Sequence, residues 1–204
     1  MNHLFLDTST TFCSINLSIK NELVYSKHWE SKNNHSEDIY KYFSHISDDL
    51  DKVDYIGVLT GPGGFNSIRI GISFVLAVSL SKSIKLLALP THQVQAIDFI
   101  NSKKEITSII QCGKKMISWA EFKGGEFEPI NSGIIAENNF IGDGYCGETN
   151  DFSVKGPRPY KNILETSNYL INKFGFTQPE NILPIYAREP SISKPNEPYK
   201  KFIE

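Results

Sequence analysis

Residues 12–20 alternate strictly between apolar and polar side chains, and this pattern constrains the fold more than any other feature of the sequence. The apolar positions are Cys13, Ile15, Leu17 and Ile19. A period of two is typical of a strand with one buried face. Asn21 and Glu22 predict a turn, and residues 23–29 predict the returning strand of a hairpin. Because residues 3–7 also form a short apolar run, we expect three consecutive strands at the start of the chain.

The pattern then changes to helices alternating with strands. Ser36 predicts a helix N-terminus, and apolar residues follow at helical spacing as far as Leu50. A strand at 55–59, a helix over about 65–81, a strand at 84–89 and a helix opening at Pro90-Thr91 come next. The order β-β-β-α-β-α-β-α describes one lobe of the ribonuclease H-like, actin-type architecture.

The second half of the sequence predicts a weaker repeat of this lobe. Its expected elements are strands at 105–111, 115–122 and 133–136, a glycine-rich stretch at 141–144 and a helix over 160–174. We therefore expect an α/β, actin-like fold of two lobes. Residues 1–100 form the first lobe, and residues 101–204 form a degenerate second one. Pro179, Pro184, Pro190, Pro195 and Pro198 indicate a tail of loop or extended chain.

Composition and charge exclude several classes of protein. No run of eighteen apolar residues is present, so we expect no membrane span. The N-terminus has no basic and apolar leader, so secretion is not expected. The odd number of widely spaced cysteines predicts free thiols in a reducing cytosol: Cys13, Cys112 and Cys146. A net charge of −2 gives no broad electrostatic basis for holding RNA directly.

Arginine is rare in this chain, which has 21 basic residues of which only three are arginines: Arg69, Arg158 and Arg188. Such a bias is typical of an AT-rich genome that favours lysine codons. The arginines that remain are expected where the planar, forked guanidinium is needed, because lysine offers only a single ammonium.

Two loops carry residue types that bind phosphate or metal in other proteins. Asp7, Thr8 and Ser9 end the first strand, and their hydroxyls and amides either ligate an anion or satisfy the strand end. The second loop, Gly61-Pro62-Gly63-Gly64, lies between a strand and a helix, where backbone amides can receive phosphate. Its spacing matches no dinucleotide or P-loop motif, so a tight structural turn is the alternative.

The helix after this loop carries one charge, Arg69, between Gly63 and Ser81. It is apolar on two opposite sides. One arc contains Phe65, Ile68, Ile72, Val75 and Leu76, and the other contains Ile70, Phe74, Ala77 and Val78. The sheet can cover one side only. Either the second lobe or another chain covers the other, because large apolar patches are rarely left exposed. Arg69 is expected to pair with a carboxylate or carbonyl.

Metal-binding and nucleophilic motifs are not found in the sequence. His35, His45 and His92 stand apart from other metal ligands, and Gln95 and Ala96 occupy the positions one helical turn after His92. No cysteine has an adjacent histidine, and no Gly-x-Ser-x-Gly elbow occurs. The chain therefore predicts a non-catalytic protein with no metal and no cofactor.

Four segments together resemble the TsaB (YeaZ) family. The first is Leu4-Phe5-Leu6-Asp7-Thr8-Ser9, and the second is His35-Ser36. The third, Gly61-Pro62-Gly63-Gly64-Phe65-Asn66-Ser67-Ile68-Arg69-Ile70-Gly71, resembles the family signature Gly-Pro-Gly-Ser-Phe-Thr-Gly-Leu-Arg-Ile-Gly. The last, Leu183-Pro184-Ile185-Tyr186-Ala187-Arg188, resembles the closing Pro-x-Tyr-x-Arg segment. The chain departs from the family at Gly64, Asn66 and Ser67, and also at residues 111–115.

This resemblance implies an ASKHA fold and a cytoplasmic scaffold in the synthesis of threonylcarbamoyladenosine on tRNA. The implied partners are a TsaD-type transferase and a TsaE-type ATPase, with tRNA contacted only through the complex and a homodimer when the chain is alone. TsaD-type enzymes carry a His-x-x-x-His pair where this chain has only His92. The implied vestigial cofactor loops are Asp7, Thr8, Ser9, Gly61, Gly63 and Gly64.

The resemblance also implies a partner interface on the first two helices. Its predicted residues are Ile39, Tyr42, Phe43, Phe65, Ile68, Arg69, Ile70, Gly71, Phe74 and Val78. The alternative is an active actin-fold carbamoyl- or phosphotransferase, which would use the Asp7 loop and Gly142-Asp143-Gly144 for nucleotide and metal.

Overall fold

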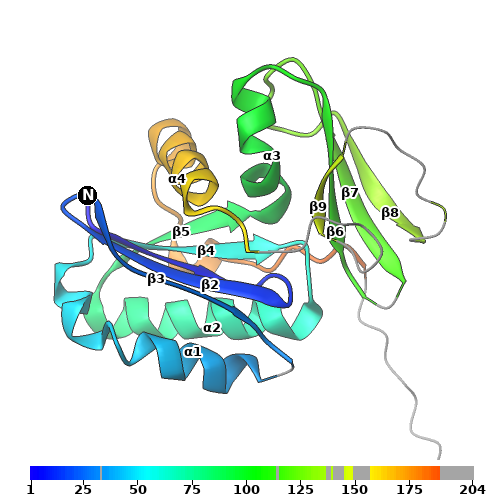
Figure 1. Ribbon diagram of the computed structural model, residues 1–204. Coiled ribbons are helices and arrows are strands. Elements are labelled where there is room, and N and C mark those ends of the chain that lie inside the picture. The colour runs from blue at the N-terminus through cyan, green and yellow to red at the C-terminus, as the bar shows by residue number, and fades with distance from the viewer. Residues whose placement is uncertain (33, 114, 137–138, 140–144, 149–156, 189–204) are drawn as a thin grey trace, which may run out of the picture.

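The computed structural model describes residues 1–32, 34–113, 115–136, 139, 145–148 and 157–188. Its first sheet has five strands in the order β3-β2-β1-β4-β5 (Figure 1). These strands are β1 (His3–Asp7), β2 (Phe12–Ile19), β3 (Glu22–Glu30), β4 (Tyr55–Gly61) and β5 (Lys85–Pro90). The first three are antiparallel neighbours, and β4 and β5 run parallel to β1. The three consecutive strands predicted at the start of the chain are therefore confirmed.

The β2–β3 hairpin turns one residue earlier than the sequence predicts. Ile19 pairs with Glu22, so the loop consists of Lys20 and Asn21, both with positive φ (54° and 65°). Two left-handed residues match the twist of the flanking strands. The prediction that β2 is only half buried is wrong, because the polar side chains of its other face are also buried: Ser14, Asn16 and Ser18.

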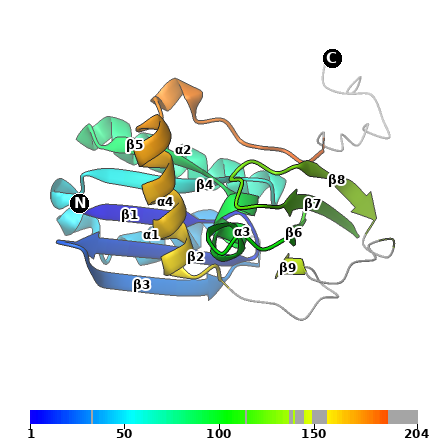
Figure 2. The ribbon, with the colours of Figure 1, turned by 90° about the horizontal axis from the view of Figure 1, so that it is seen from above.

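Helices cover both faces of the first sheet (Figures 1 and 2). On one face lie α1 (His35–Phe43) and α2 (Phe65–Lys82), and on the other lie α3 (Thr91–Asn101) and α4 (Tyr160–Phe174). Alternate residues of β1 serve the two cores, since Leu4 and Leu6 pack on the α1–α2 side and Phe5 packs on the α4 side. This double burial explains why the strand is continuously apolar.

The predicted helix from Glu37 to Leu50 is interrupted. It ends at Phe43, and a 3-10 turn, η1 (Ser47–Lys52), follows. The side chains of Ser44 and Ser47 donate hydrogen bonds to the backbone carbonyls of Lys41 and Ser44, respectively, which favours turns over a continuing helix. Asn34, rather than Ser36, occupies the N-cap position.

The second sheet repeats the order of the first in shortened form. Its strands are β6 (Ile106–Gln111), β7 (Met116–Phe122), β8 (Asn131–Ala136) and β9 (Tyr145–Glu148), in the order β8-β7-β6-β9. This order corresponds to β3-β2-β1-β4, with β9 parallel to β6. The predicted two-lobe, actin-like α/β fold is confirmed. Strand β9 was not predicted, and the glycine-rich stretch at 141–144 lies outside the described residues.

Helix α4 belongs to the predicted second lobe by sequence but packs against the first sheet (Figure 2). The hydroxyl of Tyr160 lies 2.7 Å from His3 Nε2, and that of Ser167 lies 2.8 Å from the Tyr55 hydroxyl. After α4 the chain bridges to β5 at Thr177, forms the 3-10 turn η3 (Pro179–Asn181) and runs on to Arg188. Among the described helices, none has both the length and the apolarity that crossing a membrane requires.

Candidate functional site

The Asp7 loop is buried, and an arginine from the far end of the chain fills it. Arg158 Nη1 donates to Asp7 Oδ2 at 2.9 Å and to Ser9 Oγ at 3.0 Å. The other carboxylate oxygen, Oδ1, accepts hydrogen bonds from Ser9 N and Ser9 Oγ at 2.9 and 2.7 Å. Both carboxylate oxygens of Asp7 are therefore engaged by protein groups, and its side chain is fully buried.

Thr8 is also committed to the fold rather than open to a ligand. Its hydroxyl donates to the Ser67 carbonyl at 2.8 Å. A side chain on Gly71 would collide with this hydroxyl, so glycine allows α2 to approach the loop closely. The three residues predicted as a vestigial cofactor loop thus form internal contacts, which is the structural alternative that the sequence left open.

The glycine loop packs directly on the Asp7 loop. Gly64 N donates to the Ser9 carbonyl at 2.8 Å, and a side chain on Gly63 would collide with the same carbonyl. Gly61 has a φ of 109°, in the left-handed region that favours glycine, and a side chain there would meet the carbonyl of Ile185. In this structure the glycines serve close backbone approach, so the tight-turn alternative describes them.

His92 lies in a polar cluster between α3 and the second sheet. Its ring nitrogens lie 2.8 Å from Ser108 Oγ and 3.0 Å from Ser118 Oγ. Burial, with a smaller contribution from the nearby charge of Arg158, lowers the pKa of His92 to about 3. The ring is therefore neutral at physiological pH.

Gln95, one turn after His92, joins α3 to the second sheet and also contacts Arg158. Its amide nitrogen lies 2.9 Å from each of three acceptors, Ser108 Oγ and the carbonyl oxygens of Ile109 and Cys146, which share its two protons. Its oxygen faces Arg158 Nη2 at 3.5 Å. Cys146 is itself held in the cluster, and burial raises the pKa of its thiol to about 12. Among the described residues, no three His, Cys, Asp or Glu side chains lie close enough together to hold a metal.

The outer side of α2 forms the second candidate site, an exposed stripe beside α1. The sheet-facing side of α2 is buried and contains Ser67, Ile68, Gly71, Ile72, Val75 and Ser79. The stripe that we call the outer stripe contains Asn66, Arg69, Ser73, Ala77 and Leu80, which are exposed and recur every three or four residues. Ile70, Phe74 and Val78 are half-buried beside it, and the Phe74 ring packs edge-on against Phe43 at 4.7 Å.

Three of the predicted interface residues lie below this surface. Ile39 and Ile68 are fully buried, and Gly71 is covered by Thr8. Ile68 and Gly71 support the helix face from inside the chain, whereas Ile39 also lines the groove described below. The predicted residues that retain exposed surface are Tyr42, Phe43, Phe65, Arg69, Ile70, Phe74 and Val78.

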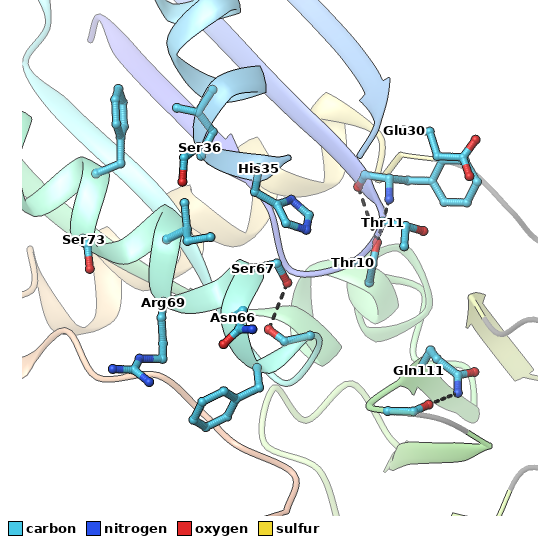
Figure 3. Close-up of a pocket in the computed structure, with 17 residues that line it drawn as sticks. Thr10, Thr11, Glu30, His35, Ser36, Asn66, Ser67, Arg69, Ser73 and Gln111 are labelled. Atoms are coloured by element: carbon cyan, nitrogen blue, oxygen red, sulfur yellow. Dashed lines mark hydrogen bonds between the residues drawn. The ribbon is translucent and has the colours of Figure 1, made fainter. Parts of the chain in front are cut away.

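A groove of about 1240 Å³ opens at the N-terminal ends of α1 and α2 (Figure 3). Five predicted interface residues line it: Ile39, Phe65, Arg69, Ile70 and Phe74. Polar side chains from the β1–β2 turn, α1 and β6 complete the walls, including Thr10, Thr11, Ser36 and Gln111. Both sheets therefore contribute to the groove, and the α1–α2 surface continues into it.

Among the residues that the structure describes, no carboxylate or carbonyl is paired with Arg69, for which the sequence predicted such a partner. Its side chain is exposed, and its guanidinium lies 5.3 Å from the centre of the Phe65 ring. The Phe65 ring also contacts the C-terminal segment, because the Tyr186 ring stacks on it with 4.6 Å between ring centroids. Ile185 N also donates to the Thr60 carbonyl at 2.7 Å, so residues 182–188 cross the N-terminus of α2.

Two site residues were missed by the sequence analysis, Arg158 and Gln95. Arg158 is 151 positions from Asp7, so no local pattern could join them. Amino-acid composition was the one available indication of Arg158, because the sequence favours lysine and yet has arginine at this position. Gly142-Asp143-Gly144, which the enzyme alternative requires, lies outside the described residues.

Comparison with known proteins agrees with the predicted resemblance. No protein-family model matches the chain. A curated relative, the tRNA threonylcarbamoyladenosine biosynthesis protein TsaB of Buchnera aphidicola subsp. Acyrthosiphon pisum (strain APS), is 26% identical over 125 residues. The alignment covers 58% of this chain and only 56% of that protein.

Two solved structures share the fold over most of both chains. One is YeaZ from Pseudomonas aeruginosa, with a TM-score of 0.72 and 17% identity, covering 91% of this chain and 99% of that one. The other is a protein with similarity to the peptidase YEAZ, also from P. aeruginosa, with a TM-score of 0.72 and 19% identity, covering 92% and 99%. At this identity the two structures establish the fold alone.

Proposed function

We propose that this chain, a relative of the TsaB (YeaZ) proteins in both sequence and fold, takes part in threonylcarbamoyladenosine synthesis on tRNA as a non-catalytic scaffold. The role of the Buchnera relative, tRNA threonylcarbamoyladenosine biosynthesis, supports the assignment to this process. The observation that favours a scaffold over an enzyme is the occupied Asp7 loop. Its carboxylate is buried against Arg158, so the enzyme alternative would have to displace an internal ion pair before nucleotide or metal could bind.

The scaffold would act through the α1–α2 surface. The outer stripe of α2 bears one charge, Arg69, and is bordered by the half-buried Ile70 and Phe74. Tyr40 on α1 and Leu80 on α2 are 73% and 71% exposed, which leaves large apolar side chains available to a partner. The groove at the N-terminal ends of α1 and α2 offers a concave region into which a partner side chain could insert.

The proposed partner on this surface is a TsaD-type transferase, with a TsaE-type ATPase binding the assembled pair in the cytoplasm. When the chain is alone, the same surface would pair two copies about a two-fold axis, because an isologous interface needs one self-complementary patch. Contact with tRNA would come only through the complex, consistent with the net charge of −2.

Two measurements test the scaffold proposal. The purified chain should release no phosphate from ATP in the presence of magnesium, whereas an actin-fold transferase would turn over. It should also co-elute with the TsaD-type transferase of the same organism in size-exclusion chromatography with light scattering. ATP turnover that copurifies with the chain, and that is lost in an Asp7→Asn variant shown by circular dichroism to be folded, would overturn the proposal in favour of the enzyme alternative.

A further inference from the structure

The junction of the two sheets contains a buried positive charge surrounded by oxygen atoms. Arg158 is 5% exposed and Asp7 is 0% exposed. Three oxygens face the guanidinium: Asp7 Oδ2 at 2.9 Å, Ser9 Oγ at 3.0 Å and Gln95 Oε1 at 3.5 Å. They come from the loop after β1 and from α3, while Arg158 comes from the segment before α4.

The oxygens that receive Arg158 are held in place by other bonds. Ser9 Oγ donates to Asp7 Oδ1, which orients its lone pairs towards the guanidinium. The amide nitrogen of Gln95 is fixed by Ser108 and by the carbonyls of Ile109 and Cys146, so its oxygen is directed away from the second sheet. None of these four bonds is made to Arg158.

We propose that these residues form a guanidinium-binding site that the chain fills with its own Arg158, joining the first sheet to α3 and, through Gln95, to the second sheet. A planar cation with several donors suits the arrangement, because one group can reach Asp7, Ser9 and Gln95 together. Lysine would present a single ammonium and could not span the same acceptors with fixed geometry. The inference does not depend on the proposed function.

The Asp7–Arg158 ion pair can be tested through the stability that is lost when Arg158 is removed. Removing Arg158 leaves the Asp7 carboxylate buried and unpaired, which is strongly destabilising. For a chain of this size we expect Arg158→Ala to lower the thermal midpoint by roughly 10 °C. The vacated space would retain the three oxygens and match a free guanidinium ion in charge and shape.

Free guanidinium should therefore restore stability to the Arg158→Ala variant. Millimolar guanidinium chloride should raise the thermal midpoint of Arg158→Ala by a few degrees relative to the same concentration of sodium chloride, because a ligand that binds only the folded state stabilises it. The wild type should show no increase, since its site is filled. Lys161→Ala is the matched control and should show neither the loss nor the rescue, because it removes only exposed ion pairs with Asp98 and Glu165.

The double variant Asp7→Asn, Arg158→Ala identifies the ligand-binding group. It should lose the rescue, because an amide has no charge to pair with guanidinium. Hydrogen exchange at β6 and β9 should be faster in Arg158→Ala and slow again when guanidinium is added. Equal responses of Arg158→Ala, the double variant and Lys161→Ala to guanidinium would overturn the proposal.

If Arg158→Ala does not fold, the wild type provides the test directly. A guanidinium held by three acceptors should give separate, slowly exchanging Nη proton signals for Arg158 in nitrogen-resolved NMR spectra. Arg69, whose guanidinium is exposed on Phe65, should give averaged and rapidly exchanging signals. Averaged Nη signals for Arg158 would show that the site does not hold it.

Discussion

At the scale of single residues, burial at the junction of the two sheets changes how a side chain takes up protons, and His92 is an example. Its ring nitrogens lie within hydrogen-bonding distance of two serine hydroxyls, and the sequence did not predict these neighbours. Burial and the neighbouring Arg158 disfavour the imidazolium. Such a residue contributes to stability only while it remains neutral.

We predict that His92 makes the protein sensitive to acid. Its pKa is about 3 in the folded chain against 6.5 for an ordinary histidine, so the unfolded chain binds the additional proton between these values. The stability contribution is therefore present above about pH 6.5 and is lost as the pH falls towards about 3. Between about pH 7 and about pH 4.5 the loss should be about 2–3 kcal/mol.

Urea unfolding at the two pH values measures this loss. His92→Gln keeps a neutral polar group and should reduce the pH dependence, whereas His28→Gln, at an exposed position of β3, should leave it unchanged. An identical pH dependence in His92→Gln and the wild type would show that His92 does not cause it.

The last two glycines of the loop before α2, Gly63 and Gly64, should differ in their tolerance of a side chain. Gly63→Ala places a methyl group against the Ser9 backbone carbonyl, which is fixed by the Asp7 loop, and should cost about 2–4 kcal/mol. Gly64→Ala meets only the Ser67 hydroxyl, which can rotate, so its cost should be about 1 kcal/mol or less. Chemical denaturation of both variants gives the comparison, and equal losses would contradict it.

At the scale of elements, the two sides of α2 have different roles. The side with Ile68, Ile72 and Val75 is buried on the sheet, and this confirms one of the two apolar arcs as a core face. The opposite arc is only partly covered by α1 through the Phe43–Phe74 contact. Phe74→Asp, the natural first choice for blocking an interface, would therefore disturb the packing of α1 as well.

We predict that Ser73→Glu separates association from folding. Ser73 is exposed in the centre of the outer stripe, so a carboxylate there remains solvated in the free chain but would be buried in a complex. The variant should keep the wild-type thermal midpoint and weaken self-association or transferase binding at least tenfold, as measured by light scattering and calorimetry. Ser132→Glu, at an exposed position of β8, is the control and should bind normally.

At the scale of the whole molecule, the proposed role requires contact rather than chemistry. In a strain depleted of this protein, Ser73→Glu should restore little threonylcarbamoyladenosine, whereas His92→Gln should restore most of it if it folds. Mass spectrometry of tRNA nucleosides measures both. Asp7→Ala is unsuitable for this comparison, because it leaves Arg158 buried without its carboxylate and so changes stability as well as chemistry. Full restoration by Ser73→Glu would contradict a role for the outer stripe.

The amino-acid sequence by itself determined the succession of strands and helices, because that succession depends on short-range periodicity. The alternation over 12–20, the helical spacing after Ser36 and the glycines at 61–64 each act within a few residues. Even there, local hydrogen bonds of Ser44 and Ser47 ended α1 earlier than its apolar spacing predicted.

Only the tertiary structure decided which side chains meet. Asp7 and Arg158 form one buried pair across 151 positions, and α4 returns to the first sheet although it follows the second in sequence. The exposure of the outer stripe of α2 likewise depends on where α1 ends and where the second sheet lies (Figure 1). The physical reason is that burial and ion pairing depend on distance in space, which periodicity along the chain does not encode.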